Sequence, residues 1–257
     1  MSETNNANNA NNGNNGNNGN NGNNGNNGNN GNNANNGNNA SDSNAQRAQR
    51  FDTATLSDAL DRLGIVGQCT GIKPRDASFR LCGRAFTILY GPPTTPPGTV
   101  GDYIDDVPEG GVIVLDNAGR EECTVWGDIL TEIAHRRKIA GTVIDGICRD
   151  VSLCLSLGYP VFSKGHWMRT GKDRVQVEST QVPVNIGNAR VLPGDLLIGD
   201  ADGVIVIPRV HEDRVLAAAE EIHAAEHAIR EAARQGMRLD EARQQHRYHA
   251  LQTKVSA

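Results

Sequence analysis

The sequence lacks the features that mark nucleic-acid binding, membrane insertion or secretion. Its formal net charge is −5, and no run of Lys and Arg interleaves with the few aromatic residues, so we expect no nucleic-acid partner. The longest apolar stretches, such as GVIVLD and GVIVIP, fall far short of the roughly 20 residues that a membrane span needs. The N-terminus also has no apolar signal region. These absences predict a cytoplasmic protein without a membrane partner.

Cysteine is too sparse and too irregularly spaced for a disulfide framework or a zinc finger. The chain has 5 cysteines, with no C-x-x-C pair and no His at zinc-finger spacing, so we expect reduced thiols. Cys148 lies beside Arg149 and could have a lowered pKa and act as a nucleophile. A small residue packed at the end of a strand is the simpler interpretation, and we assign Cys148 no chemistry.

The first forty residues are almost entirely Asn and Gly. Their only apolar side chains are Met1 and four alanines, too few to build a core, so they cannot fold alone. We therefore divide the chain into a disordered Asn/Gly-rich tail, residues 1–44, and one folded domain, residues 45–257. That domain has roughly 210 residues, enough for one sizeable core.

Apolar strands alternate with helical segments in the centre of the chain, a pattern typical of parallel βαβ units. It predicts a strand over 111–116, a loop over 117–126, a helix over 128–138, a strand over 141–146, a helix over 151–158 and a strand over 160–165. Outside the centre we expect a helix over 53–64, a strand over 82–91, a hairpin within 194–208, a long helix over 212–234 and a shorter one over 240–251. The fold class is α/β.

Charged residues stand at the ends of two neighbouring elements of this predicted βαβ unit. Asp128 begins the crossover helix, and Arg149 and Asp150 follow the next strand. Ligands of parallel α/β proteins gather at this edge of the sheet, near the N-termini of helices. Gly127 and Gly146 precede these charges, where the backbone must turn tightly or approach a ligand closely.

The residue types indicate a metal site combined with an anion clamp. Mg²⁺ is usually held by one or two carboxylates and keeps several waters, and Asp128 and Asp150 are a plausible pair. The planar fork of Arg149 pairs with a carboxylate bidentately, and the exposed amides of Ile129 and Leu130 offer a second anchor. Such a site fits a small 2-oxo acid.

A plainer alternative has equal weight on spacing alone. Asp128 would cap its helix, and Arg149 and Asp150 would form a surface ion pair worth about 0 to 1 kcal/mol.

The segment DNAGREECTVWGDILTEIAHRRKIAGTVIDGICRDV resembles the centre of the RraA-like superfamily, specifically of its 4-hydroxy-4-methyl-2-oxoglutarate aldolase branch. Members of that branch carry an Asp, twenty residues and then Arg-Asp, and Asp128, Arg149 and Asp150 keep this spacing. The resemblance continues through TATLSDALDRLG, CGRAFT, PVNIGNARVLPGDLLIGDADGVIVIP and YHALQ. It covers essentially the whole predicted domain.

The resemblance implies an α-β-β-α sandwich, a homotrimer or hexamer, and active sites between subunits. It implies a class II (metal-dependent) pyruvate aldolase, using Mg²⁺ or Mn²⁺, that cleaves 4-hydroxy-2-oxo dicarboxylic acids to pyruvate through a metal-stabilised enolate. Oxaloacetate decarboxylation would be a side activity of the same site.

The resemblance also assigns roles to residues. Asp150 would hold the metal, largely through waters, and Asp128 would orient a metal-bound water. Arg149 would bind the substrate together with the backbone of the 127–130 segment: Gly127, Asp128, Ile129 and Leu130. Ser152 and Leu153 depart from the pattern, because some relatives have an acidic residue shortly after the Arg-Asp pair.

Two other functions compete with this interpretation. The namesake of the superfamily is a regulator that binds and inhibits an RNA-degrading endonuclease, but the intact Asp and Arg-Asp spacing favours an enzyme. HAAEH, residues 223–227, matches the H-x-x-E-H pattern of one metalloprotease group. A helix rich in Ala, Glu and Arg often places such letters together by chance.

Overall fold

The computed structural model describes residues 42–246. The predicted tail, except for its last three residues, and the YHALQ segment lie outside this range. Helix α1 (Ser43–Ala48) begins two residues before the predicted start of the folded domain. Among residues 42–246, no helix combines the length and the apolar character needed to cross a membrane.

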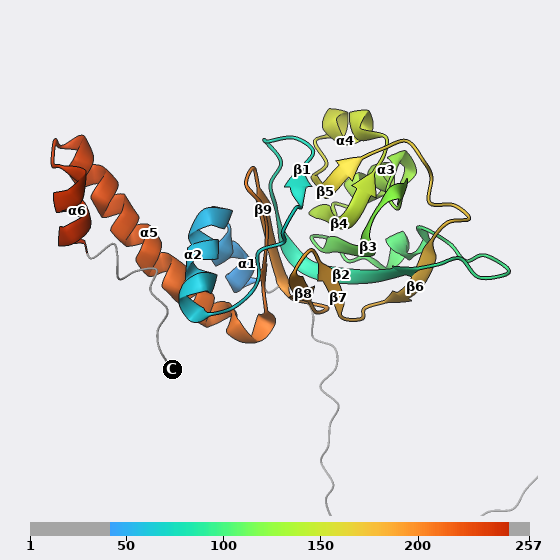
Figure 1. The fold of residues 1–257 in the computed structure, drawn as a ribbon, viewed down its shortest axis with the longest axis horizontal. Coiled ribbons are helices and arrows are strands. Elements are labelled where there is room, and N and C mark those ends of the chain that lie inside the picture. Colours follow the sequence, from blue (N-terminus) through green and yellow to red (C-terminus); the bar gives the residue numbers. More distant parts are fainter. Residues whose placement is uncertain (1–41, 247–257) are drawn as a thin grey trace, which may run out of the picture. The chain divides into compact units, whose positions relative to one another are not determined.

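A mixed sheet forms the centre of the domain (Figure 1). Its strand order is β1-β5-β4-β3-β2-β9-β10, with β6 also paired to β2. Strands β2, β3, β4 and β5 are parallel to one another, whereas β1, β6, β9 and β10 pair antiparallel with their neighbours. The strands are β1 (Lys73–Pro74), β2 (Leu81–Gly91), β3 (Val112–Thr124), β4 (Gly141–Cys148), β5 (Val161–His166), β6 (Gln176–Thr180), β9 (Leu196–Asp200) and β10 (Gly203–Ile207). A separate hairpin joins β7 (Val184–Ile186) and β8 (Ala189–Val191).

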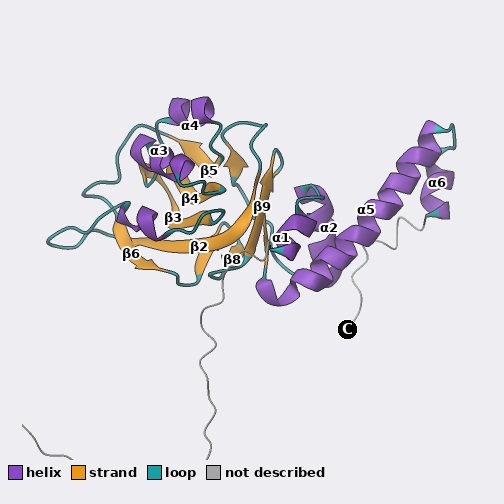
Figure 2. Cartoon of the chain, turned by 180° about the vertical axis from the view of Figure 1, so that it is seen from behind, coloured by secondary structure: helices purple, strands orange, loops and turns teal. Residues whose placement is uncertain are grey.

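Helices flank the strands in two groups, as both views of the chain show (Figures 1 and 2). Helices α3 (Asp128–Arg136) and α4 (Val151–Leu157) lie over the parallel strands, and α1, α2 (Thr53–Leu63) and α5 (Glu212–Arg234) lie beside β9. A short helix, α6 (Leu239–Gln245), follows α5, and the 3₁₀ helices are η1 (Asp102–Asp106) and η2 (Arg209–His211). The domain is thus the α-β-β-α arrangement expected from the resemblance.

Strands β9 and β10 face two hydrophobic cores at once. Leu197, Val204 and Val206 belong to the core shared with the parallel strands, whereas alternate residues such as Leu196 and Ile205 pack against α1, α2 and α5. Because successive side chains of a strand point to opposite faces, the strands of this hairpin are buried on both sides, and even their polar residue Asp200 is only 6% exposed. This explains the unbroken apolar run GVIVI.

Within residues 42–246 the predicted elements are confirmed, with one correction. The helix predicted over 240–251 is α6 as far as Gln245, and residues 247–251 lie outside the described range. The loop predicted over 117–126 is wrong for its first eight residues, because β3 continues to Thr124. The chain leaves the sheet only briefly: Asp116 pairs with Asp145, and pairing with β4 resumes at Arg120 and Thr124 after register shifts. Ala118, with φ 52°, and Gly119, with φ 68°, form the irregularity. The sequence of this part of β3, NAGREE, contains residues that are typical of loops, and the prediction therefore missed the strand.

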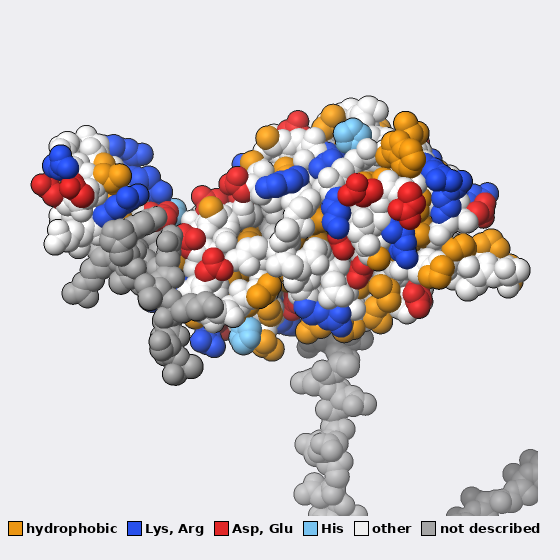
Figure 3. Space-filling model, in the orientation of Figure 1, with side chains coloured by type: hydrophobic (Ala, Val, Ile, Leu, Met, Phe, Trp, Pro, Cys, Tyr) orange, Lys and Arg blue, Asp and Glu red, His pale blue; other side chains and the backbone are white. Residues whose placement is uncertain are grey.

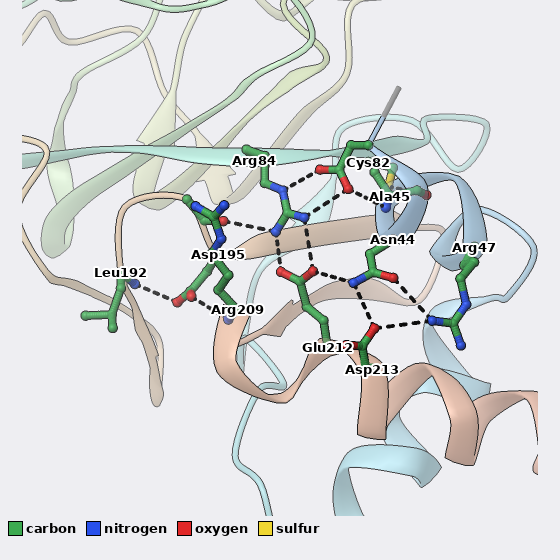
Figure 4. Close-up of polar contacts among 12 residues, drawn as sticks. Asn44, Ala45, Arg47, Cys82, Arg84, Leu192, Asp195, Arg209, Glu212 and Asp213 are labelled. Carbon is green, nitrogen blue, oxygen red and sulfur yellow. Dashed lines mark hydrogen bonds and ion pairs between the residues drawn. The ribbon is translucent and has the colours of Figure 1, made fainter. Parts of the chain in front are cut away.

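A buried ion-pair network attaches the terminal helices to the sheet (Figure 4). Arg84 on β2 pairs with Glu212, the first residue of α5, and donates from Nη2 to Asp42 Oδ1 at 3.0 Å. Arg84 holds the pKa of Asp42, the cap of α1, below its usual range. The Glu212 residue is only 4% exposed, and its carboxylate also accepts a hydrogen bond from Asn44 Nδ2 at 3.0 Å.

We expect Arg84→Met to destabilise the domain by about 3–5 kcal/mol, because it removes the only cation that pairs with the buried Glu212 carboxylate within the described residues and leaves it the hydrogen bond from Asn44. The matched control is Arg62→Met, which removes an exposed ion pair with Glu221, a residue of α5 like Glu212. Its loss should lower the free energy of unfolding by less than about 1 kcal/mol. Urea unfolding followed by circular dichroism measures both. Equal losses in the two variants would contradict this interpretation of Glu212.

Candidate functional site

The structure brings the predicted site residues together where the segment before α3 crosses the end of β4. The Arg149 amide donates to the Trp126 carbonyl at 2.9 Å. The Asp128 amide donates to Asp150 Oδ2 at 3.1 Å, and Arg149 Nε lies 3.2 Å from the same oxygen. One carboxylate oxygen therefore joins the two halves of the predicted motif.

Gly127 is required by this contact rather than by its backbone angles. Its φ of −152° is extended backbone that any residue adopts. A Cβ at this position would lie 2.8 Å from Asp150 Oδ2 and 3.0 Å from Arg149 Nε. We predicted a tight turn or the close approach of a ligand at Gly127, and the group that approaches it here is the Arg149–Asp150 pair.

Asp150 has a strained backbone. Its φ of 55° and ψ of 39° are left-handed, a conformation that costs a non-glycine residue on the order of 1–3 kcal/mol, although Asp tolerates it better than most. Asp150 occupies the N-cap position of α4 but makes no side-chain cap bond. Its carboxylate is turned instead toward Asp128, which indicates that the side chain serves the site and not the helix.

Asp128 is not the cap of its helix either. Gly127 occupies the N-cap position of α3, and Asp128 Oδ1 accepts from the adjacent Ile129 amide at 2.8 Å. The Ile129 amide is therefore engaged here, and a ligand reaches it only if the Asp128 carboxylate turns away. The Leu130 amide is one of the first four helical N–H groups, which have no intrahelical acceptor.

Buried aromatic residues hold this segment from behind. Trp126, 2% exposed, donates from Nε1 to Thr131 Oγ1 at 2.9 Å, and Thr131 donates to the Gly127 carbonyl at 2.8 Å. The indole also stacks on Tyr159 at 6.0 Å between ring centroids. These supporting roles had no signal in the sequence beyond the position of Trp126 next to Gly127.

A cleft of about 610 Å³ opens beside the motif. Arg149 lines it, whereas Asp150 lies behind, against Gly127. The other walls come from the segment before β3, from the first turns of α3 and from the turn after β5. They comprise residues 98–102, 104–105, 124–130, 133 and 170–172. Neither the 98–105 segment nor the 170–172 turn was predicted as a site element, because neither carries a motif.

The donor set fits a hard divalent cation. Asp150 Oδ1 and Asp128 Oδ2 accept no hydrogen bond from any residue between 42 and 246, and the Asp150 side chain is 39% exposed. Within the same range, no group of three or more His, Cys, Asp or Glu residues is placed to hold a metal. Two carboxylates suit Mg²⁺, which keeps most of its waters, and do not suit a fully protein-ligated zinc.

The other chemical candidates have structural roles. Burial raises the pKa of the Cys148 thiol, and all five cysteines are free, which confirms that Cys148 is a packed residue. His223 packs edge-on against Phe51 at 5.6 Å, and Glu226 pairs with Arg230 at 3.2 Å. The HAAEH segment therefore belongs to the packing of α5.

Comparison with known proteins establishes the family. A model of the RraA-like family, described as Aldolase/RraA, matches residues 53–206, and the chain belongs to this family. Protein DlpA of Legionella pneumophila is 41% identical over 201 residues, which are 77% of this chain but only 32% of that protein. A Halalkalibacterium halodurans protein named "Putative 4-hydroxy-4-methyl-2-oxoglutarate aldolase" is 34% identical over 68% of this chain and 81% of its own length.

Solved structures share the fold. An uncharacterized protein from Pseudomonas syringae pv. tomato matches with a TM-score of 0.73 and 42% identity, covering 78% of this chain and 96% of that one. Streptomyces coelicolor RraAS2, described as an unusual member of the RNase ES inhibitor RraA protein family, matches with a TM-score of 0.67 and 26% identity over 72% of this chain and 93% of its own. The relatives thus include proteins named as aldolases and proteins named for RNase inhibition.

We expect Gly127→Ala to fold normally and to bind pyruvate about tenfold more weakly, a loss of about 1.4 kcal/mol. The added Cβ fits the backbone but displaces the Arg149–Asp150 pair. Isothermal titration with pyruvate in the presence of Mg²⁺ measures the loss. Gly165→Ala is the control, because the nearest atom to its added Cβ lies at an ordinary 3.6 Å. Unchanged pyruvate binding by Gly127→Ala would show that the contact has no role in the site.

Proposed function

We propose that this protein is a divalent-metal-dependent lyase that cleaves 4-hydroxy-2-oxo dicarboxylic acids to pyruvate and decarboxylates oxaloacetate as a side activity. The observation that carries the proposal is the junction at the edge of a cleft, where Asp150 Oδ2 accepts from the amide of Asp128, the first residue of α3, and pairs with Arg149. The names of relatives such as the H. halodurans protein support the same reaction.

The chain's own residues suit binding of the shared 2-oxo acid portion. The Arg149 side chain is 37% exposed and lines the cleft, and its guanidinium can pair bidentately with the substrate's 1-carboxylate. The Leu130 amide at the positive end of α3 adds a second donor. Apolar neighbours, among them Val100 and Ile133, line the same cleft and strengthen these interactions by excluding water.

The reaction requires stabilisation of an enolate. Breaking the bond between C3 and C4 moves its electron pair onto the C2 carbonyl, while the 4-hydroxyl gives up its proton; a proton then adds to C3 and forms pyruvate. Oxaloacetate reaches the same enolate by losing CO₂. A bound divalent cation, held by Asp150 and approached by Asp128, would supply an electrophile for the developing charge. Asp128 Oδ2, which accepts no hydrogen bond within the described range, would hold a proton in transit.

We also propose that the active unit is a homotrimer or hexamer. Apolar side chains lie exposed near the site: Ile129 is 70% exposed, Trp167 42% and Met168 73%. The Trp167 amide donates to the Cys148 carbonyl at 2.9 Å, directly before Arg149. A second copy covering this surface would remove these side chains from water.

We predict that the wild-type protein releases pyruvate from 4-hydroxy-4-methyl-2-oxoglutarate and from oxaloacetate only when Mg²⁺ or Mn²⁺ is present. Arg149→Lys keeps the charge but loses the bidentate fork, so kcat/KM should fall by about 10²-fold. An assay coupled to lactate dehydrogenase measures the rate at which pyruvate is released.

The control for that prediction is Arg190→Lys, because Arg190 is an exposed residue whose hydrogen bond to Asn185 lies on the β7–β8 hairpin. If no 2-oxo acid is turned over and the protein instead inhibits an RNA-degrading endonuclease, with Arg149→Lys fully active as an inhibitor, the regulator function replaces the lyase.

A further inference from the structure

Lys172 stands on the wall of the same cleft, in a turn that is fixed to the site. The Thr124 amide donates to the Arg169 carbonyl at 3.0 Å, and Thr124 forms an isolated bridge with Thr170. A Cβ on Gly171 would lie 2.4 Å from the Thr124 carbonyl oxygen. Thr124 is three residues before Gly127, so the 124–127 segment connects this turn to the start of α3.

Further bonds close the turn around Lys172. Its amide donates to Thr170 Oγ1 at 3.2 Å, and Arg174 donates from Nη1 to the Lys172 carbonyl at 3.1 Å. The Val175 amide donates to the Gly171 carbonyl at 3.0 Å. Basic side chains gather on the surface over the segment between β5 and β6 (Figure 3, with Figure 1 for the elements). The backbone of Lys172 is therefore fixed while its long side chain lines the cleft.

The ammonium group of Lys172 has no ion-pair partner between residues 42 and 246. The other cation lining the cleft, Arg149, pairs with Asp150, and Asp105 pairs with Arg137 at 3.4 Å. Two acidic groups, Asp102 and Asp128, also line the cleft. The cleft thus presents two cations from different elements, one following β4 and one in the turn after β5.

We infer that Lys172 binds the second carboxylate of a 2-oxo dicarboxylic acid whose 1-carboxylate lies on Arg149, so that Lys172 selects dicarboxylic over monocarboxylic substrates. The inference rests on the proposed function, because it takes Arg149 as the anchor of the 2-oxo acid portion. A cleft of about 610 Å³ lies within the roughly 300–1,000 Å³ of small-molecule sites. It has room for a five- or six-carbon acid.

A matched pair of ligands tests this role without requiring turnover. The two compounds 2-oxoglutarate and 2-oxopentanoate have the same chain length and differ only in a terminal carboxylate or methyl group. Calorimetry with the full chain and Mg²⁺ should show 2-oxoglutarate binding about tenfold more tightly, the size of a charge-assisted contact. Lys172→Met should abolish that difference and leave the affinity for 2-oxopentanoate unchanged. Raising the salt concentration should reduce the difference in affinity between the two compounds in the wild type.

Lys138→Met is the control, because it removes one positive charge from an exposed residue that pairs with Glu109 and does not line the cleft. It should keep the preference for 2-oxoglutarate. Two results would overturn the role of Lys172 without touching the proposed function. The wild type could bind both compounds with equal affinity, or Lys172→Met could lose affinity for both compounds equally. Failure of the wild type to bind either compound would overturn the proposed function itself.

Discussion

At the edge of the sheet, Asp150 Oδ2 meets both the amide of Asp128 and the guanidinium of Arg149, and the candidate site depends on this junction. It forms only because Asp150 accepts a left-handed backbone and because Gly127 has no side chain. Both features disfavour an ordinary surface ion pair, which needs neither. The strain is the kind that a fold retains where a side chain must point in one direction.

The rest of the domain keeps the two halves of this junction in register. Trp126 fixes the segment before α3 through Thr131 and Tyr159, and the late part of β3 pairs with β4 as far as Thr124 and Ile147. Thr124, in the same part of β3, also forms a bridge with Thr170 in the turn that contains Lys172. The irregular end of β3 thus positions both Arg149, the proposed anion clamp, and the 170–172 wall of the cleft.

Local patterns predicted most of the fold. Helix α2 has the expected apolar spacing, a cap at Asp52 and an end at Gly64 with φ 67°, and α5 spans the predicted residues 212–234. The extension of β3 could not be predicted, since its pairing depends on β4 and not on its own polar residues. The spacing of Asp128, Arg149 and Asp150 located one side of the site. Lys172 was not found, because only the long-range contact between Thr124 and the 169–171 turn brings it to the cleft.

The central claim is that Asp150 serves a metal next to the anion clamp. Titrating Mn²⁺ into the full chain while following water-proton relaxation measures the number and affinity of bound ions directly, without any assumption about the substrate. One Mn²⁺ should bind to each wild-type chain and be lost in Asp150→Ala, whereas Asp128→Asn, which keeps an oxygen at that position, should bind the ion more weakly. Unchanged Mn²⁺ binding in Asp150→Ala, or none in the wild type, would contradict the account.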